Sequence, residues 1–514
     1  MDVGFLALIP PLLAIAIALI TKEVLLALII GVASGTLIMT DFSPLASFEL
    51  LMELILASLT EPEYMQVILI CMMLGGLIGL LVRSGGATAF SEFLQKKVSS
   101  RKGAQTTTWI VGLMLFFDDY FNCLTNGSVM RSISDDFKIS REKFSYIVDT
   151  TAVSICLIIP LSSWVAFITS LISYSFERAG IEEDAYLTFI ASIPFNFYAL
   201  TSLIMVMFVI HLKLNFRPMA KAEARVLKIG VVCEGSFSGG DAESDDFSLI
   251  ERMKGKASDL LVPIGVLYVL AFVFILYTGG FFLNFDLIEA FNEMDGLSAL
   301  IYSIFVAIIT AIILYAVKRL SKVTDSIMAF VAGTKSMVLV IIVLVFAWSL
   351  GAVTDELGAA DYLVDIMIGT VPSAVIPTLI FIISYLTAFA TGASWSTYAI
   401  MLPMAAPIAL GMNASILASI TAVIGGGGCG QHCSPLADSS ILSSAASNIR
   451  IIDHVKSQAP YALVCGSISI VGYLVTGFIG ADATAGLPLI VVAATFAGVV
   501  ILLKMVSAKH RHED

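Results

Sequence analysis

Long apolar runs recur along the whole chain, and they restrict it to a fold built inside a lipid bilayer. Of its 514 residues, 58% are hydrophobic and 13% are charged, and the mean hydropathy is +0.96. Soluble proteins carry about 25% charged residues, so a large soluble protein with a helical core does not fit. Runs of roughly 18 or more apolar residues are typical of membrane-spanning helices. The sequence therefore predicts an all-α polytopic membrane protein.

About eleven segments are apolar and long enough to cross the membrane once. They lie near 3–20, 24–40, 65–82, 147–174, 187–212, 259–280, 297–317, 327–350, 415–447, 461–480 and 487–505. Two further hydrophobic segments, 105–130 and 373–411, are interrupted by polar residues. The run 48–59 carries Glu49 and Glu53 and is too short to span, so it predicts an interfacial helix.

Lys and Arg concentrate in one set of loops and are missing from another. The basic set comprises loops 83–104, 131–143 and 317–325 and the C-terminal tail. The set without Lys or Arg comprises loops 41–64, 281–296, 351–371 and 481–486. Because basic loops stay in the cytoplasm, we expect an external N-terminus and a cytoplasmic C-terminus. This assignment of loops to the two sides of the membrane is consistent only if 105–130 and 373–411 are re-entrant hairpins of opposite orientation.

One long polar segment, 213–257, separates a first transmembrane half, 1–212, from a second, 258–514. It changes from basic to acidic and Gly/Ser-rich and back to basic, which predicts a cytoplasmic linker, with a regulatory domain as the alternative. A hairpin with a polar tip followed by a broken helix occurs in both halves, within 65–212 and 327–480. Similar halves with opposite loop charge predict an inverted-topology repeat, whose sites lie near the midplane at two discontinuous helices.

The stretch 425–448, GGGGCGQHCSPLADSSILSSAASN, is the most unusual part of the second half. Glycine costs about 1 kcal/mol and proline about 3 kcal/mol against alanine inside a helix. The four glycines and Pro435 therefore predict a discontinuous helix. Broken backbone at membrane depth survives only where protein buries it or where it lines a watery cavity. Asp438 in this stretch is accordingly a functional-site hypothesis.

Three soft ligands in the same stretch, Cys429, His432 and Cys433, resemble part of a metal site. They lack a fourth ligand, and zinc sites space their ligands more widely, so we interpret His432 as a proton-responsive or hydrogen-bonding group. No GxSxG, Walker or Rossmann pattern stands in a suitable context. We therefore expect neither an enzyme nor a cofactor, and the net charge of -12 argues against nucleic acid as a partner.

The tip of the first hairpin is acidic. Asp118 and Asp119 follow an apolar run, and a carboxylate in hydrocarbon costs roughly 2.5–3.5 kcal/mol on insertion scales. With Asn122 they supply the hard oxygen ligands that a small cation prefers, and adjacent carboxylates can also share a proton. A pair of loop carboxylates in interfacial water is the alternative. Thr151 and Ser163 belong to the broken helix that follows, where hydroxyls act as ligands or in packing.

The tip of the second hairpin, TGASWST at 391–397, gathers hydroxyls around Trp395. Two interpretations stay open for this indole, closure over a substrate and packing at an interface. Asp149, near the start of the first broken helix, is interpreted as a helix-start carboxylate near the cytoplasmic face.

These motifs resemble those of NhaC-type Na+/H+ antiporters, within the ion-transporter superfamily of inverted-repeat carriers. The resemblance covers nearly the whole chain, and its most specific motifs are FFDDYFN at 116–122, SWVAF at 163–167, TGASWST at 391–397, HCSPLADSSILSS at 432–444 and IDHV at 452–455. It implies a first-half polar site of Asp118, Asp119 and Asn122. It implies a second-half site of Thr391, Ser394, Trp395, His432, Ser434, Asp438 and Ser439.

One position departs from the family pattern. Members commonly have an aspartate directly before the histidine, and this chain has Gln431. Glutamine cannot bind a proton near neutral pH, so a cation ligand or a titrating group is lost. Members of the family also carry amino acids and small carboxylates, which keeps a second substrate class open.

Two functions follow from the resemblance. The first is Na+/H+ antiport by alternating access, in which Asp438 and the Asp118/Asp119 pair bind cation and proton competitively, with Asp118 and Asp438 as Na+ ligands. The second is Na+- or H+-coupled transport of an amino acid or small organic acid. In both cases Na+ and/or H+ are the coupling ions. We expect a multi-pass protein of the bacterial cytoplasmic (inner) membrane, and because related carriers are often dimers, a homodimer is compatible with the sequence.

Overall fold

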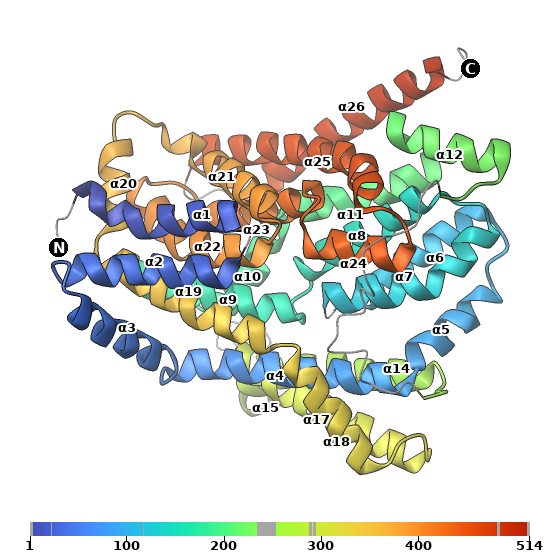
Figure 1. Cartoon of the computed structure of the whole chain (residues 1–514), viewed down its shortest axis with the longest axis horizontal. Coiled ribbons are helices and arrows are strands. Elements are labelled where there is room, and N and C mark those ends of the chain that lie inside the picture. The colour runs from blue at the N-terminus through green and yellow to red at the C-terminus, as the bar shows by residue number, and fades with distance from the viewer. Residues whose placement is uncertain are drawn as a thin grey trace.

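The computed structural model describes residues 4–21, 23–116, 118–233, 253–286, 290, 294–480 and 484–510, and these are helical with no strand among them. Most helices run along the long axis of the molecule, and η1 and the last turns of α26 lie toward its opposite ends (Figure 1). Before the linker the helices are η1 (Gly4–Leu8), α1 (Ile9–Thr21), α2 (Val24–Met39), α3 (Pro44–Ser58), α4 (Pro62–Ser84), α5 (Gly86–Gln95), α6 (Arg101–Met114), α7 (Asp119–Asp136), α8 (Arg141–Cys156), α9 (Ser163–Ala179), α10 (Ala185–Ser192), η2 (Ile193–Phe195) and α11 (Phe197–Leu212). From the linker onward they are α12 (Arg217–Ile229), α14 (Ser258–Thr278), α15 (Phe281–Asn284), α17 (Gly296–Val317), α18 (Val323–Lys335), α19 (Val338–Glu356), α20 (Ala359–Met367), η3 (Ser373–Val375), α21 (Ile376–Thr391), α22 (Ser394–Gly411), α23 (Ile416–Cys433), α24 (Asp438–Ser447), α25 (Ile451–Ile479) and α26 (Gly486–His510).

The all-α polytopic prediction is confirmed. Across the described part of the chain, 8 helices are long and apolar enough to cross a membrane. Such helices overlap the spans predicted near 65–82, 259–280, 297–317, 327–350, 461–480 and 487–505. The predicted span 187–212 is divided between a shorter apolar helix, Ala185–Phe195, and a long helix that begins at Phe197. The predicted spans 3–20 and 24–40 are shorter apolar helices. The remaining long helix, Ser373–Thr391, forms one arm of the second predicted hairpin.

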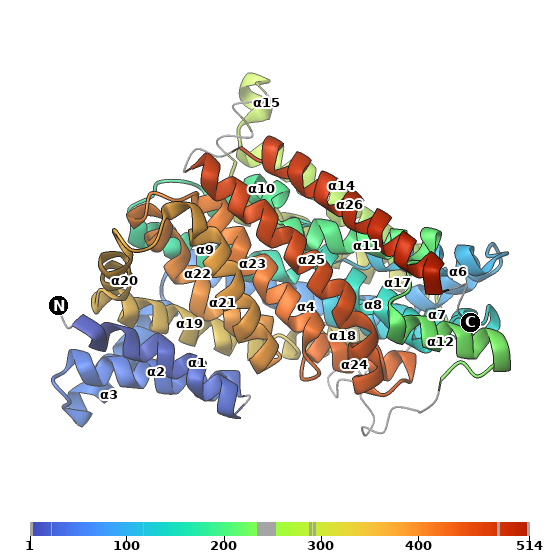
Figure 2. The same ribbon diagram turned by 90° about the horizontal axis from the view of Figure 1, so that it is seen from above.

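The two predicted spans at 147–174 and 415–447 are each broken into two helices, as their polar segments indicated. The chain leaves helical geometry between α8 and α9, and again between α23 and α24. Two views agree that α8 and α24 lie in the half of the molecule that holds the end of α26, whereas α9 and α23 lie in the other half (Figures 1 and 2). The two broken helices therefore run in opposite directions.

The glycine run does not cause the second break. Residues 425–428 lie inside α23, which continues to Cys433. A Cβ on Gly426 would lie 2.5 Å from the backbone oxygen of Phe381, and one on Gly430 would lie 2.4 Å from that of Tyr385. These glycines let α23 approach the backbone of α21, as small residues do between membrane helices. The break begins after Cys433, next to Pro435, whose ring has no N–H to donate.

The hairpins α6/α7 and α21/α22 approach the middle of the molecule from opposite ends (Figures 1 and 2). The first turns at Asp118, whose side chain caps α7 by accepting a hydrogen bond of 2.9 Å from the N–H of Phe121. The second turns at Gly392, which has a φ of +75°. A Cβ on Gly392 would lie 2.5 Å from the backbone oxygen of Leu436, so this tip lies against the break after α23.

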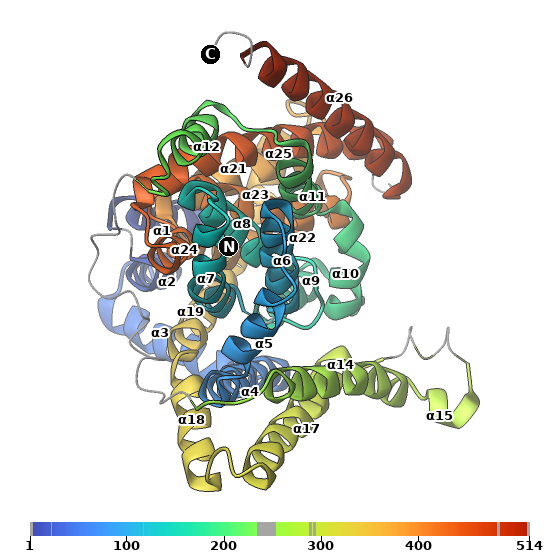
Figure 3. The same cartoon turned by 90° about the vertical axis from the view of Figure 1, so that its right-hand side faces the viewer.

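A second layer consists of α4, α14, α17 and α18, and it lies beside the body that holds the breaks (Figure 3). Within it, α4 packs against α17 and α18, and α14 packs against α17. The outer face of α17 exposes large apolar side chains such as Phe305 and Ile313. Apolar side chains on the outside of a spanning helix face lipid.

The linker begins with an amphipathic helix, α12, that packs on the body. Glu223 is buried there and accepts hydrogen bonds from Arg101 at 2.9 Å and from the hydroxyl of Ser140 at 2.9 Å. Arg225 pairs with Glu142 at 2.9 Å. The acidic part of the predicted linker, 234–252, lies outside the described residues.

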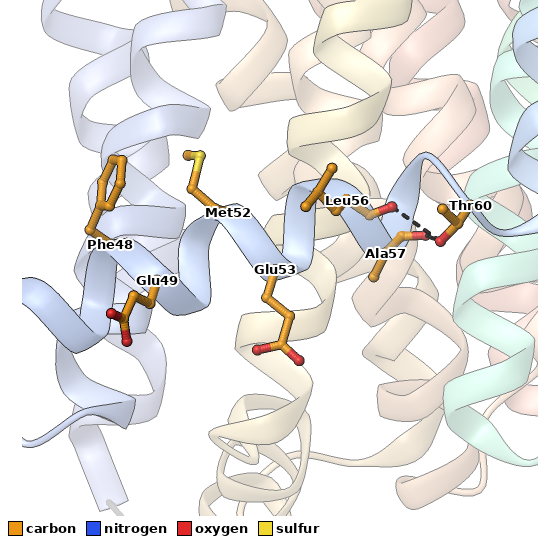
Figure 4. Close-up of a pocket in the computed structure, with 7 residues that line it drawn as sticks. All are labelled: Phe48, Glu49, Met52, Glu53, Leu56, Ala57 and Thr60. Atoms are coloured by element: carbon orange, nitrogen blue, oxygen red, sulfur yellow. Dashed lines mark hydrogen bonds between the residues drawn. The ribbon is translucent and has the colours of Figure 1, made fainter.

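The run 48–59 lies almost entirely within α3, a helix of 15 residues. Its outer face borders a shallow hollow of about 560 Å³ lined only by residues of α3 and its C-terminal end. Glu49 and Glu53 project from one side of this helix, and Phe48 and Met52 project from the other (Figure 4). A single helix with carboxylates on one side agrees with an interfacial position and does not form a substrate site.

Candidate functional site

The tip of the first hairpin contacts the starts of both helices that follow the breaks. The hydroxyl of Ser163, at the start of α9, donates to Asp118 at 3.1 Å. The indole N–H of Trp164 donates to Asp119 at 2.8 Å. The hydroxyl of Tyr120 donates to Asp438, at the start of α24, at 3.0 Å. The structure therefore brings the acidic tip and both breaks to one place.

Asp119 has one oxygen that no donor reaches. Its side chain is 0% exposed, and among the described residues Oδ2 has no hydrogen-bond partner. The same holds for Oδ1 of Asn122, whose amide nitrogen donates to the carbonyl of Gly112 at 2.7 Å. Residues three apart share a helix face, so these two oxygens lie on one face of the first turn of α7. A buried acceptor without a donor costs about 1–3 kcal/mol, and a small cation or a proton would satisfy it.

The tip of the second hairpin approaches the same region from the other end. Ser394 donates to the side-chain oxygen of Gln431 at 2.6 Å. The ring of Trp395 lies 4.4 Å from that of Trp164 and 4.5 Å from that of Phe167. Because Trp164 also binds Asp119, one aromatic pair joins the acidic tip to the second hairpin.

Several other predicted site residues bond only near themselves. Thr151 donates to the carbonyl of Ile147 at 2.6 Å, and Thr391 donates to that of Thr387 at 2.8 Å. The hydroxyl of Ser434 accepts from the N–H of Leu436 at 3.2 Å and so shapes the break. Ser439 is buried, and its hydroxyl has no partner among the described residues. The sequence analysis grouped these four residues with the carboxylates. Among the described residues, none of the four forms a hydrogen bond to a carboxylate of the site.

Asp438 and His432 occupy different surroundings. The Asp438 side chain is exposed, and it reaches the first tip through Tyr120 rather than through Asp118. His432 is buried and shares a hydrogen bond of 2.6 Å between Nδ1 and the hydroxyl of Tyr198. Cys429 contacts the carbonyl of Ala462 at 3.6 Å.

A buried network around Asp149 was not predicted. Asp149 lies in the interior of α8 and accepts hydrogen bonds from His454 at 3.0 Å and from Gln458 at 2.6 Å, both on α25. Near the start of a predicted helix this carboxylate suggested a cap, and a partner 305 positions away gives no local signal. The motif that contains His454 was noted only as part of the family resemblance.

Comparisons with known proteins identify a family and several relatives. A family model described as the Na+/H+ antiporter family matches residues 155–478. A Haemophilus influenzae protein described as uncharacterized is 33% identical over 485 residues, which is 92% of this chain and 91% of that protein. The arginine/ornithine antiporter ArcD of Halobacterium salinarum is 32% identical over 108 residues, 21% of this chain and 22% of that protein. Among solved structures, the Alcanivorax borkumensis YdaH transporter shares the fold, with a TM-score of 0.57 and 14% identity over 82% of this chain and 86% of that chain.

Proposed function

The chain belongs to the Na+/H+ antiporter family and is a multi-pass secondary transporter, and from that premise we propose that it exchanges Na+ for H+ by alternating access. The matched family and the neighbouring structure are transporters, a class distinct from enzymes. One observation supports the choice of a small cation as cargo. The buried pair Asp118 and Asp119 stands at the meeting point of both breaks, and Oδ2 of Asp119 has no hydrogen-bond partner among the described residues.

In this proposal Na+ binds between Asp119 and Asn122. Their unpartnered oxygens lie on one helix face and are hard ligands of the kind that small cations take. Asp118 stays bound by Ser163 and by the cap of α7, so it contributes charge without having to rotate. Charge interactions strengthen at low dielectric, which favours a cation over neutral cargo at this point.

Asp438 takes a second role. Its exposed carboxylate accepts the hydrogen bond of Tyr120, the residue that follows Asp119. We propose that Na+ passes from Asp438 to Asp119 when the carrier opens on this side. Opening on the other side requires Trp164 and Trp395 to separate, because their rings fill the space between the two tips.

A carrier of amino or organic acids is the second candidate. Two observations favour it: the match to an arginine/ornithine antiporter over 108 residues, and the neutral Gln431 bonded to Ser394. In such a carrier the helix N-termini at the breaks would hold the substrate carboxylate. We propose for either function a position in the bacterial inner membrane with a cytoplasmic C-terminus, and a homodimer is compatible with both.

Reconstitution in vesicles separates the two functions. Adding Na+ outside vesicles with an imposed pH gradient should collapse that gradient, and adding choline should not. Asp438→Ala should slow the collapse, and an unchanged rate would remove Asp438 from the pathway.

A thermal-shift screen of amino acids, organic acids and Na+ completes the test. Stabilisation by an amino or organic acid, without a response to Na+ alone, would favour the second candidate.

A further inference from the structure

A second buried carboxylate, Asp149, lies close to the acidic tip and has its own set of partners. Asp149 and His454 are both 0% exposed. Oδ2 of Asp149 accepts from Nε2 of His454 at 3.0 Å, from Gln458 at 2.6 Å and from the hydroxyl of Ser440 at 3.1 Å. Asp149 belongs to α8, Ser440 to α24, and the other two to α25, so the network joins the two halves of the chain.

This network begins one helical turn from the proposed cation site. Cys123, four residues after Asp119, lies on the same face of α7, about 5–6 Å further along it. Its sulfur lies 4.0 Å from Oδ1 of Asp149. Gln458 also donates to the backbone oxygen of His432 at 3.1 Å, next to Gln431. The network therefore contacts elements of both proposed binding regions without sharing their ligands.

Neither protonation state of His454 satisfies every polar atom of this network. With a neutral imidazole, Nε2–H donates to Asp149 and the buried carboxylate keeps an unbalanced charge. With an imidazolium the charges balance, but Nδ1–H then needs an acceptor, and Nδ1 has no partner among the described residues. Burying an unpaired charge and burying an unpaired donor are both costly. Each protonation state of His454 therefore leaves one group of the network unmatched.

The groups around Asp149 determine how its negative charge is balanced. The titratable side chains that act on Asp149 are those of Cys123 on α7 and His454 on α25, which contact it, and that of His432 on α23, which acts through its charge. Ser443 on α24 adds a neutral hydroxyl 3.4 Å from Nε2 of His454. None of these contacts supplies a fixed cation. Of the two histidines, His454 bonds directly to Asp149, whereas His432 bonds to Tyr198, so a proton on His454 is the one that balances the charge of Asp149 most directly.

We propose that the Asp149–His454 pair carries the coupling proton of the exchange, apart from the cation site at Asp119 and Asn122; this inference rests on the proposed function. When Na+ binds near Asp119, it adds one positive charge about one helical turn from Cys123, which contacts Asp149. This charge favours release of the proton from Nδ1 of His454 to water. When Na+ departs, the imidazole takes a proton back. In a one-for-one exchange the net charge of the buried region stays constant. The electrostatic free energy of the conformational change therefore stays low.

Two assays on reconstituted protein separate the proton carrier from the cation site. One follows exchange of radioactive Na+ for Na+ across the membrane, which needs no proton, and the other follows Na+-driven proton movement. His454→Gln should keep Na+/Na+ exchange within about twofold of the wild type and lose about tenfold or more of the proton movement. His211→Gln, an exposed histidine on α11, is the control and should change neither.

Asp149→Asn is the second variant. It should likewise keep Na+/Na+ exchange and lose Na+-driven proton movement, because it removes the charge that stabilises the imidazolium. If His454→Gln leaves both activities intact, the proton is carried elsewhere and the inference is overturned. If it abolishes both, the pair supports the cation site itself, which overturns the inference as well. Wild-type vesicles that show neither activity would instead overturn the proposed function, together with the inference that rests on it.

Discussion

Tyr120 at the first hairpin tip donates a hydrogen bond of 3.0 Å to Asp438 at the start of α24, joining residues 318 positions apart. This bond links the buried carboxylate pair to an exposed one and crosses from the first half of the chain to the second. It makes Asp438 a neighbour of the proposed cation site rather than a ligand within it.

Tyr120→Phe should weaken Na+-driven exchange less than Asp438→Ala does. The variant keeps the ring and removes only the hydroxyl, and a hydrogen bond to a charged group contributes about 1.5–3 kcal/mol before screening by solvent. Because Asp438 is exposed, we expect a smaller effect, within about tenfold in the Na+ concentration for half-maximal exchange. A Tyr120→Phe variant more impaired than Asp438→Ala would show that the tyrosine, and not the carboxylate, is the primary element.

Trp164→Phe should destabilise the protein in Na+-free buffer. It keeps an aromatic ring against Trp395 but removes the donor to Asp119, which leaves a second unpaired oxygen at a cost of about 1–3 kcal/mol. Added Na+ should recover part of the loss in melting temperature, whereas choline should not. Trp348→Phe is the matched control, because the indole N–H of Trp348 has no partner within the described part of the chain. Equal losses for the two variants would contradict a specific role for the Trp164 bond.

Gly430→Ala should lower the melting temperature. Its new methyl group would lie 2.4 Å from the backbone oxygen of Tyr385, which cannot move without displacing α21. Overpacking of this kind costs about 1–3 kcal/mol. Gly498→Ala in α26 meets no atom of the described residues within 4 Å and should be neutral or stabilising, since alanine is the better helix former. A Gly430→Ala protein as stable as Gly498→Ala would contradict the close approach of α21 and α23.

Glu223→Gln should detach α12 from the body. Lys143 is 2% exposed and lies 3.5 Å from Glu223, so the substitution leaves a buried ammonium without its carboxylate. Removing one partner of a buried pair costs about 3–5 kcal/mol, and the partly exposed Arg101 adds less. The loss in melting temperature should change little with salt, because buried pairs are poorly screened. Glu183→Gln, an exposed carboxylate, serves as the control; a similar loss there would point to a general charge effect.

Local patterns predicted the parts of the site that depend on local chemistry. Pro435 and the polar residues of the first broken helix, such as Ser163, correctly marked the two breaks, and the carboxylates at 118 and 119 correctly marked a tip. The glycines at 425–428 were misread as a break, because the same residues that weaken an isolated helix allow close packing against another. Thr151 and Thr391 satisfy their hydroxyls on their own helix, which residue type does not reveal. The pairing of Asp149 with His454 depends on how α8 and α25 meet, and no periodicity encodes that contact.

The most direct test of the central claim is Na+-driven collapse of a pH gradient by Asp119→Asn, measured beside wild type and Asp361→Asn. Asp361 is an exposed carboxylate on α20 and controls for the loss of one charge. The proposed site predicts that Asp119→Asn needs about tenfold more Na+ or fails to exchange, while Asp361→Asn matches the wild type. An Asp119→Asn protein that exchanges Na+ for H+ with the wild-type Na+ dependence would contradict the site.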